Sequence, residues 1–160
     1  MLNGDDDPAP FFHRRANPVW PSACGLDVAL LLDRSGSIGS SDMTSLKNAA
    51  NGFVNSLTGT QSRISVTSFN STVTPGVGFT LVPNAAAATP VHNAINALPA
   101  SGSGSTNWDA AFRSVQGAGA DIVVILTDGD PTVYGATGNQ GSGTSGSCKA
   151  LHVQVELNRR

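Results

Sequence analysis

Apolar residues fall along this chain in short strand-like runs separated by helical repeats. Residues 27–32 and 121–126 are almost continuously apolar, as strands buried on both faces of a parallel sheet are. Residues 63–69 alternate polar with apolar positions and are rich in β-branched side chains, which predicts a further strand. Residues 72–82 add a short antiparallel edge strand, broken by its internal Pro-Gly pair.

A long helix is predicted after the first strand. Ser40 or Ser41 can cap its first turn, and Gly59 ends it. Between these points apolar residues recur at steps of three and four, which gives the helix one face directed at the sheet. The residues of this face are Met43, Leu46, Ala50, Phe53, Val54 and Leu57.

Two shorter helices follow. Thr89 and Pro90 have the cap and first-turn proline of a helix start, and the apolar repeat continues until Pro99. Residues 107–115 form the next helix. Because strands and helices alternate in this way, we predict an α/β fold: a doubly wound, mainly parallel sheet flanked by helices.

The two ends of the chain lack this pattern. Residues 1–26 contain four prolines and no sustained periodicity, which indicates a linker or lead-in to a domain over residues 27–134. Residues 135–160 are an irregular tail rich in Gly and Ser. We therefore expect the fold to be truncated or altered after Tyr134. One hypothesis is that the last ~20 residues belong to a shifted reading frame, because the strand and helix pattern stops abruptly.

Composition narrows the classes of function. With 160 residues, 12% charged residues and a formal net charge of −2, the chain fits one domain without a basic surface for nucleic acid. No apolar run approaches the ~20 residues of a membrane-spanning helix. Residues 1–8 lack the basic and apolar regions of a signal peptide, so either the protein stays inside the cell or its true start is missing.

The two cysteines leave two alternatives open. Cys24 precedes the first strand and Cys148 follows the last apolar one, so a disulfide between them would close the base of the domain. The other alternative is two unrelated thiols.

Oxygen-bearing side chains gather where the apolar strands end. Asp33, Ser35 and Ser37 follow the first strand, and Asp128 follows the last in the sequence Thr-Asp-Gly. Thr106 lies between them in a loop rich in Gly and Ser. Loops at the carboxyl ends of parallel strands converge on one crevice, so these side chains are expected to meet. Two carboxylates and three hydroxyls favour Mg²⁺, Mn²⁺ or Ca²⁺ over zinc.

The Asp-x-Ser-x-Ser run, the loop threonine and the strand-Thr-Asp-Gly element resemble the metal-ion-dependent adhesion site of von Willebrand factor type A (VWA) domains. The resemblance is closest to the bacterial surface-protein members of that family. It implies five metal ligands: Asp33, Ser35, Ser37, Thr106 and Asp128. Ser101, Ser103 and Ser105 are close alternatives to Thr106, which matches the family's pattern of a threonine just before a helix.

The resemblance also implies a function. It indicates a divalent-metal-dependent adhesion or ligand-binding module, without enzymatic turnover, whose protein partner supplies an Asp or Glu carboxylate to the cation. An extracellular or cell-surface location follows from this interpretation. The alternative within the family is an intracellular, cytoplasmic assembly or regulatory subunit of an ATP-driven complex.

A fragment of a subtilisin-like protease is the less favoured alternative. Asp33, His92 and Ser145 occur in the Asp, His, Ser order of those enzymes. However, His92 has no glycine neighbours, and no helix of small residues follows Ser145 in its repetitive tail. The chain is also short for that fold, so we expect a binding protein rather than an enzyme.

Overall fold

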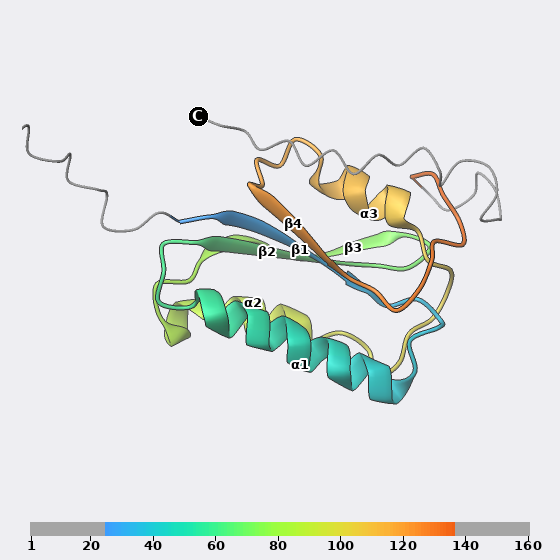
Figure 1. Cartoon of the computed structure of the whole chain (residues 1–160), viewed down its shortest axis with the longest axis horizontal. Helices are drawn as coiled ribbons and strands as arrows, with labels where there is room; N and C mark the ends of the chain where they lie inside the picture. Colours follow the sequence, from blue (N-terminus) through green and yellow to red (C-terminus); the bar gives the residue numbers. More distant parts are fainter. Residues whose placement is uncertain (1–24, 137–160) are drawn as a thin grey trace, which may run out of the picture.

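The computed structural model describes residues 25–136, which form a four-stranded sheet with helices on both faces (Figure 1). In chain order the elements are β1 (Asp27–Asp33), α1 (Ser40–Leu57), β2 (Arg63–Phe69), β3 (Val73–Leu81), α2 (Ala85–Asn96), α3 (Trp108–Val115) and β4 (Ile122–Leu126). The strand order is β3-β2-β1-β4; β1 pairs in parallel with β2 and β4, and β3 is antiparallel to β2. The predicted doubly wound, mainly parallel α/β fold is confirmed.

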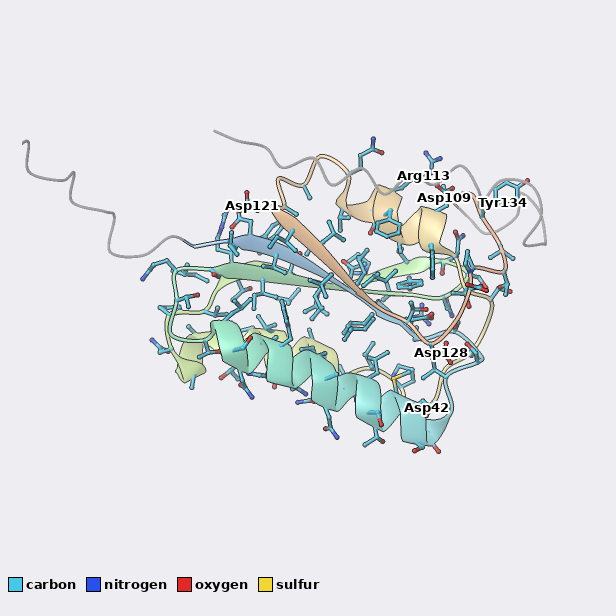
Figure 2. The ribbon with its side chains drawn as sticks, viewed as in Figure 1. Asp42, Asp109, Arg113, Asp121, Asp128 and Tyr134 are labelled. Carbon is cyan, nitrogen blue, oxygen red and sulfur yellow. The ribbon has the colours of Figure 1, made fainter. Side chains whose placement is uncertain are left out.

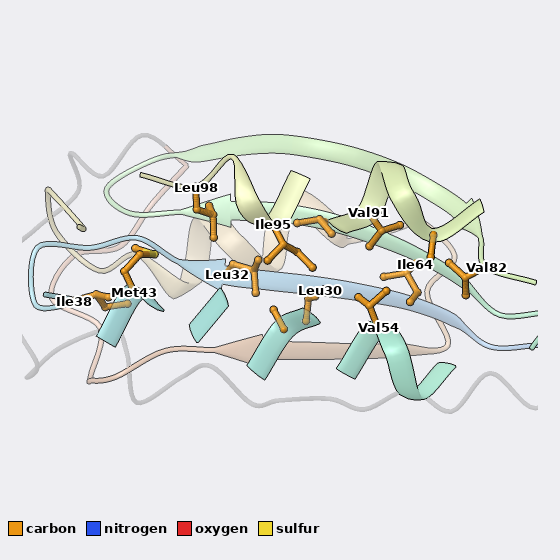
Figure 3. Packing of buried hydrophobic residues seen from close by; sticks show 13 residues of the cluster. Leu30, Leu32, Ile38, Met43, Val54, Ile64, Val82, Val91, Ile95 and Leu98 are labelled. Atoms are coloured by element: carbon orange, nitrogen blue, oxygen red, sulfur yellow. The ribbon is translucent and has the colours of Figure 1, made fainter. Parts of the chain in front are cut away.

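The apolar run of β1 is buried on both faces of the sheet. Leu30 and Leu32 belong to the larger core, which α1 and α2 cover (Figures 1 and 3). Leu31 belongs to a smaller core with residues of α3. All three leucines are fully buried. A continuous apolar run, rather than an alternating one, is therefore what this central strand requires.

The register of the sheet brings the carboxyl ends of β1, β2 and β4 to the same edge. Asp33 pairs with Phe69, and Leu32 pairs with Leu126. Figure 2 shows Asp121 and Asp128 near opposite ends of β4. At the Asp121 end, hydrogen bonds from the Arg63 side chain to the Asp27 carboxylate raise the pKa of Arg63.

The long helix α1 has the predicted apolar face but not the predicted cap. Met43, Ala50 and Val54 are buried in the larger core. The residue at the cap position is Gly39, which makes no side-chain cap hydrogen bond, so the prediction of Ser40 or Ser41 as cap was wrong. Both serines lie inside the first turn, where their carbonyl oxygens accept hydrogen bonds from side-chain hydroxyls one turn later.

The start of α2 was predicted too late. The helix begins at Ala85, where the Asn84 side chain accepts a hydrogen bond from the Ala87 N–H at 3.0 Å, and Pro90 lies inside it. Alanine has the highest helix propensity, and Ala88 is fully buried in the larger core. The stabilisation from the Asn84 cap, the alanine helix propensity and the packing of Ala88 together exceeds the free-energy cost of the backbone hydrogen bond that Pro90 removes.

The edge strand β3 continues through its Pro-Gly pair. Val66 pairs with Val77 and Thr67 with Pro75, so Gly76 is an extra residue in β3, as in a bulge. Proline is tolerated here because an edge strand does not need every N–H for the sheet. The predicted break was therefore wrong, and the strand continues with an irregular register.

Several predictions lie outside the described residues. These are the lead-in up to residue 24, the tail from residue 137, the altered C-terminal end of the fold and the pairing of Cys24 with Cys148. Among residues 25–136, no helix has the length and apolar character needed to cross a membrane.

Candidate metal centre

The centre of the site is the carboxylate of Asp33, the last residue of β1. Asp33 is fully buried. Because Leu32 pairs with Leu126, the next residue of the neighbouring strand end, Thr127, lies beside it. The Thr127 hydroxyl donates a hydrogen bond to Asp33 Oδ2 at 2.6 Å. Thr127 belongs to the Thr-Asp-Gly motif, but no role was predicted for it from the sequence. Its position at a strand end, directly before an aspartate, is the sequence feature that could have indicated one.

The turn after β1 continues the site toward the surface. The Ser35 N–H donates to Asp33 Oδ1 at 2.7 Å, and the Ser35 and Ser37 hydroxyl oxygens lie 3.2 Å apart. The Ser37 hydroxyl donates to Asp128 Oδ1 at 2.8 Å. Ser35 is buried, whereas Ser37 and Asp128 are exposed. Four of the five predicted residues thus form one hydrogen-bonded chain from the interior to the surface.

The fifth residue, Thr106, is brought to this turn by its loop. The Gly36 N–H donates to the Gly104 carbonyl and the Ser103 N–H to the Arg34 carbonyl, both at 2.8 Å. Thr106 is only 4% exposed. Unlike the hydroxyls of the β1 turn, its hydroxyl has no hydrogen-bond partner within residues 25–136. A hydroxyl oxygen without a protein partner is available to a ligand.

The alternatives to Thr106 are placed differently. Ser101 and Ser103 are exposed, and Ser105 is half-buried. The Ser105 N–H donates to the Ser71 hydroxyl at 2.9 Å, which fixes that residue against the β2–β3 loop. Thr106 is therefore the buried residue among these four.

Gly102 packs against the β1 turn so closely that no side chain fits. A Cβ atom there would lie 1.7 Å from the Ser35 carbonyl oxygen. We expect Gly102→Ala to displace the loop and to lower the free energy of unfolding by about 1–3 kcal/mol, the usual cost of overpacking. Urea unfolding followed by circular dichroism measures this change.

The matched control is Gly52→Ala. Gly52 is an exposed position inside α1, and a Cβ there meets nothing within 4 Å. That change should raise the free energy of unfolding by about 0.5–1 kcal/mol, because alanine favours helix. Equal stability of Gly102→Ala and the wild-type chain would contradict the close fit.

The electrostatics of the site favour a cation. Arg34, the nearest cation in sequence, extends to Thr74 instead, with Nη2 donating to the hydroxyl at 2.7 Å. Within residues 25–136 the ion pairs lie elsewhere, between Arg63 and Asp27 and between Arg113 and Asp109. A buried carboxylate without a cationic partner is unfavourable. A divalent ion would supply the missing positive charge at Asp33.

The donor set fits a hard cation. Among residues 25–136 no group of three or more His, Cys, Asp and Glu side chains is placed to hold a metal ion, so the candidate site relies on two carboxylates together with hydroxyls. Carboxylate and hydroxyl oxygens, as at Asp33, Ser35 and Asp128, suit Mg²⁺, Mn²⁺ or Ca²⁺.

The protease arrangement does not form among the described residues. His92 lies on α2, and its Nδ1 is 2.6 Å from the Asn51 side-chain oxygen on α1. The Asp33 carboxylate accepts its hydrogen bonds from Ser35 and Thr127 instead. Ser145 lies outside the described residues.

Comparison with known proteins identifies relatives of this fold. The family model of the von Willebrand factor type A domain matches residues 27–155. No functionally curated protein matches the chain in sequence. A similar solved structure is the vWF domain of the type V pili tip protein Mfa5 from Porphyromonas gingivalis, with 18% identity and a TM-score of 0.57 over 70% of this chain and 40% of that one. A second structure, of three N-terminal domains of the same pilus protein, gives 17% identity and a TM-score of 0.53 over 69% of this chain and 21% of that one.

Proposed function

The chain belongs to the von Willebrand factor type A domain family, and on this premise we propose that it binds a protein partner through a divalent cation held by the β1 turn. Asp33, Ser35, Ser37, Thr106 and Asp128 hold the ion, which is Mg²⁺ or, in its place, Mn²⁺ or Ca²⁺. The observation that carries the proposal is the Asp33 carboxylate: it is fully buried, lacks a cationic partner among the described residues and is hydrogen-bonded to the β1 turn. VWA domains of adhesion proteins are binding modules, and we assign no enzymatic turnover to this one.

Each side chain has a distinct task in this proposal. Asp33 supplies buried negative charge, and Thr127 fixes the orientation of its carboxylate by donating to Oδ2. Ser37 and Asp128 are exposed and hydrogen-bonded to each other, so they form the rim that a partner approaches. When bound, the cation supplies positive charge and a coordination position for an Asp or Glu carboxylate of the partner.

We also propose an extracellular or cell-surface location. A structurally similar domain belongs to a protein at the tip of a bacterial pilus. A surface location suits a site whose rim residues, Ser37 and Asp128, are open to solvent.

Titration with Mg²⁺ tests the proposal, with Thr106→Val as the informative variant. We expect the wild-type chain to bind Mg²⁺ and Thr106→Val to bind it about tenfold more weakly, because the shape is kept while one oxygen donor is lost. Isothermal titration calorimetry gives both dissociation constants.

Thr106→Ser is the control, because it keeps the hydroxyl and should stay close to the wild-type affinity. Absence of Mg²⁺, Mn²⁺ and Ca²⁺ binding by the wild-type chain would refute the proposed function. Unchanged affinity of Thr106→Val would remove Thr106 from the site and leave Ser105 as the next candidate.

A further inference from the structure

Asn107, which follows Thr106, uses every polar group of its side chain although it is fully buried. Its Oδ1 accepts a hydrogen bond from the Ala110 N–H at 3.0 Å, which caps α3. Its Nδ2 donates to the Ser71 carbonyl at 3.0 Å and to the Gly135 carbonyl at 2.8 Å. Its backbone N–H donates to the Asn70 carbonyl at 3.0 Å. The residue therefore joins the β2–β3 loop, the start of α3 and the segment after β4.

Asn84 shows that capping alone does not need these contacts. It occupies the same position before α2, and its Oδ1 accepts from the Ala87 N–H at 3.0 Å. Asn84 is exposed, and within residues 25–136 its Nδ2 makes no hydrogen bond. The two Nδ2 hydrogen bonds of Asn107 thus go beyond what a helix cap requires.

One of the segments that Asn107 joins, the segment after β4, also contacts Thr106. The Thr106 N–H donates to the Thr132 hydroxyl at 2.9 Å. The Thr106 carbonyl accepts from the N–H groups of Thr132 and Val133, at 2.9 and 3.2 Å. The segment that carries Asp128 therefore folds back on Thr106, and the Asn107–Gly135 hydrogen bond fixes it there.

We propose that Asn107 is the positioning residue of the cation site: its carboxamide holds the β2–β3 loop and the segment after Asp128 together, and this fixes the Thr106 hydroxyl at the site. The inference rests on the proposed function, because it assigns Thr106 as a ligand. A carboxamide is required because one side chain must accept from a helix N–H and donate to two carbonyls at once. Serine or aspartate would cap α3 equally well but would leave both carbonyls without a donor.

The test compares Asn107→Ser with Asn84→Ser in the full 160-residue chain. Both changes keep an oxygen that can cap the helix, because the serine hydroxyl replaces the carboxamide oxygen. We expect Asn107→Ser to weaken Mg²⁺ binding about tenfold and Asn84→Ser to change it less than about twofold. Amide hydrogen exchange of the metal-free protein, read at Thr106, Thr132 and Val133, should become faster in Asn107→Ser only.

Each outcome decides a separate claim. Wild-type Mg²⁺ affinity and exchange in folded Asn107→Ser would overturn the positioning role. If the wild-type chain binds none of Mg²⁺, Mn²⁺ and Ca²⁺, the proposed function fails, and the exchange rates still decide whether Asn107 fixes Thr106.

Asn107→Asp provides the test if Asn107→Ser does not fold. The aspartate keeps the shape and the capping oxygen but has no donor for the two carbonyls. By Coulomb attraction alone the added negative charge would tighten Mg²⁺ binding. Weaker binding would therefore support loss of position, and tighter binding would overturn it.

Discussion

Replacing Asp33 with alanine should abolish the stabilisation that Mg²⁺ gives to the wild-type chain. A ligand that binds the folded state alone stabilises it by about 2.7 kcal/mol at 100 times its dissociation constant, which corresponds to a rise in unfolding temperature on the order of 5–10 °C. Asp33 supplies the buried charge of the site, so no cation should bind without it. Thermal unfolding of both proteins across a Mg²⁺ series measures the effect.

Two further variants separate the charge of Asp33 from its structural contacts. Asp33→Asn keeps the shape and an acceptor for the Ser35 N–H, and should lose the Mg²⁺ response as alanine does. Asp42→Ala removes an exposed carboxylate from the first turn of α1 and should retain the response. A full Mg²⁺ shift in folded Asp33→Ala would place the ion elsewhere.

EDTA should abolish binding of acidic peptides to the Mg²⁺-loaded chain. The cation provides the attraction for a partner carboxylate, and its removal leaves two negative side chains, Asp33 and Asp128, facing that carboxylate. We expect a loss of at least about 100-fold in affinity, or about 2.7 kcal/mol. An array of Asp- and Glu-containing peptides, probed with and without EDTA, provides the measurement.

The control peptides carry Asn or Gln in place of each Asp or Glu. They should bind weakly under both conditions, and Asp33→Ala should behave like the EDTA-treated wild-type chain. Peptide binding that survives EDTA and does not depend on the acidic residue would contradict recognition through the cation.

The sheet could be predicted from sequence because its strands carry strong local signals. Residues 63–69 are β2 as the structure has it, and the apolar run before Asp33 is β1. Parallel strands place their carboxyl ends together, so the meeting of the β1 turn with the segment after β4 could also be predicted from the pattern. The hydrogen bond between Ser37 and Asp128 joins these two segments.

The helix starts were harder to predict, because tertiary contacts decide them. Pro90 is a strong start signal, yet α2 begins five residues earlier, where burial of Ala88 and the cap of Asn84 stabilise an extra turn. Likewise, α1 begins after Gly39 without a side-chain cap. Local sequence gives the presence of these helices but not the contacts that stabilise their first turns.

The supports of the candidate site were not predictable for a related reason. Thr127 and Asn107 are ordinary polar residues in the sequence, and their roles depend on partners in distant segments. Thr127 donates to a residue 94 positions away, and Asn107 to one 28 positions away. Only the assembled sheet brings those partners within reach.

These long separations also determine when the site can form during folding. The Asp33–Ser35–Ser37 turn is local, but Ser37 meets Asp128 across 91 positions, after β4 has paired with β1. Parallel pairing over such a separation is a late and slow event, because a long loop must close first. An unfolded or partly folded chain therefore lacks a complete site for the ion. The cation should contribute little to the speed of folding and should instead prolong the lifetime of the folded domain by slowing its unfolding.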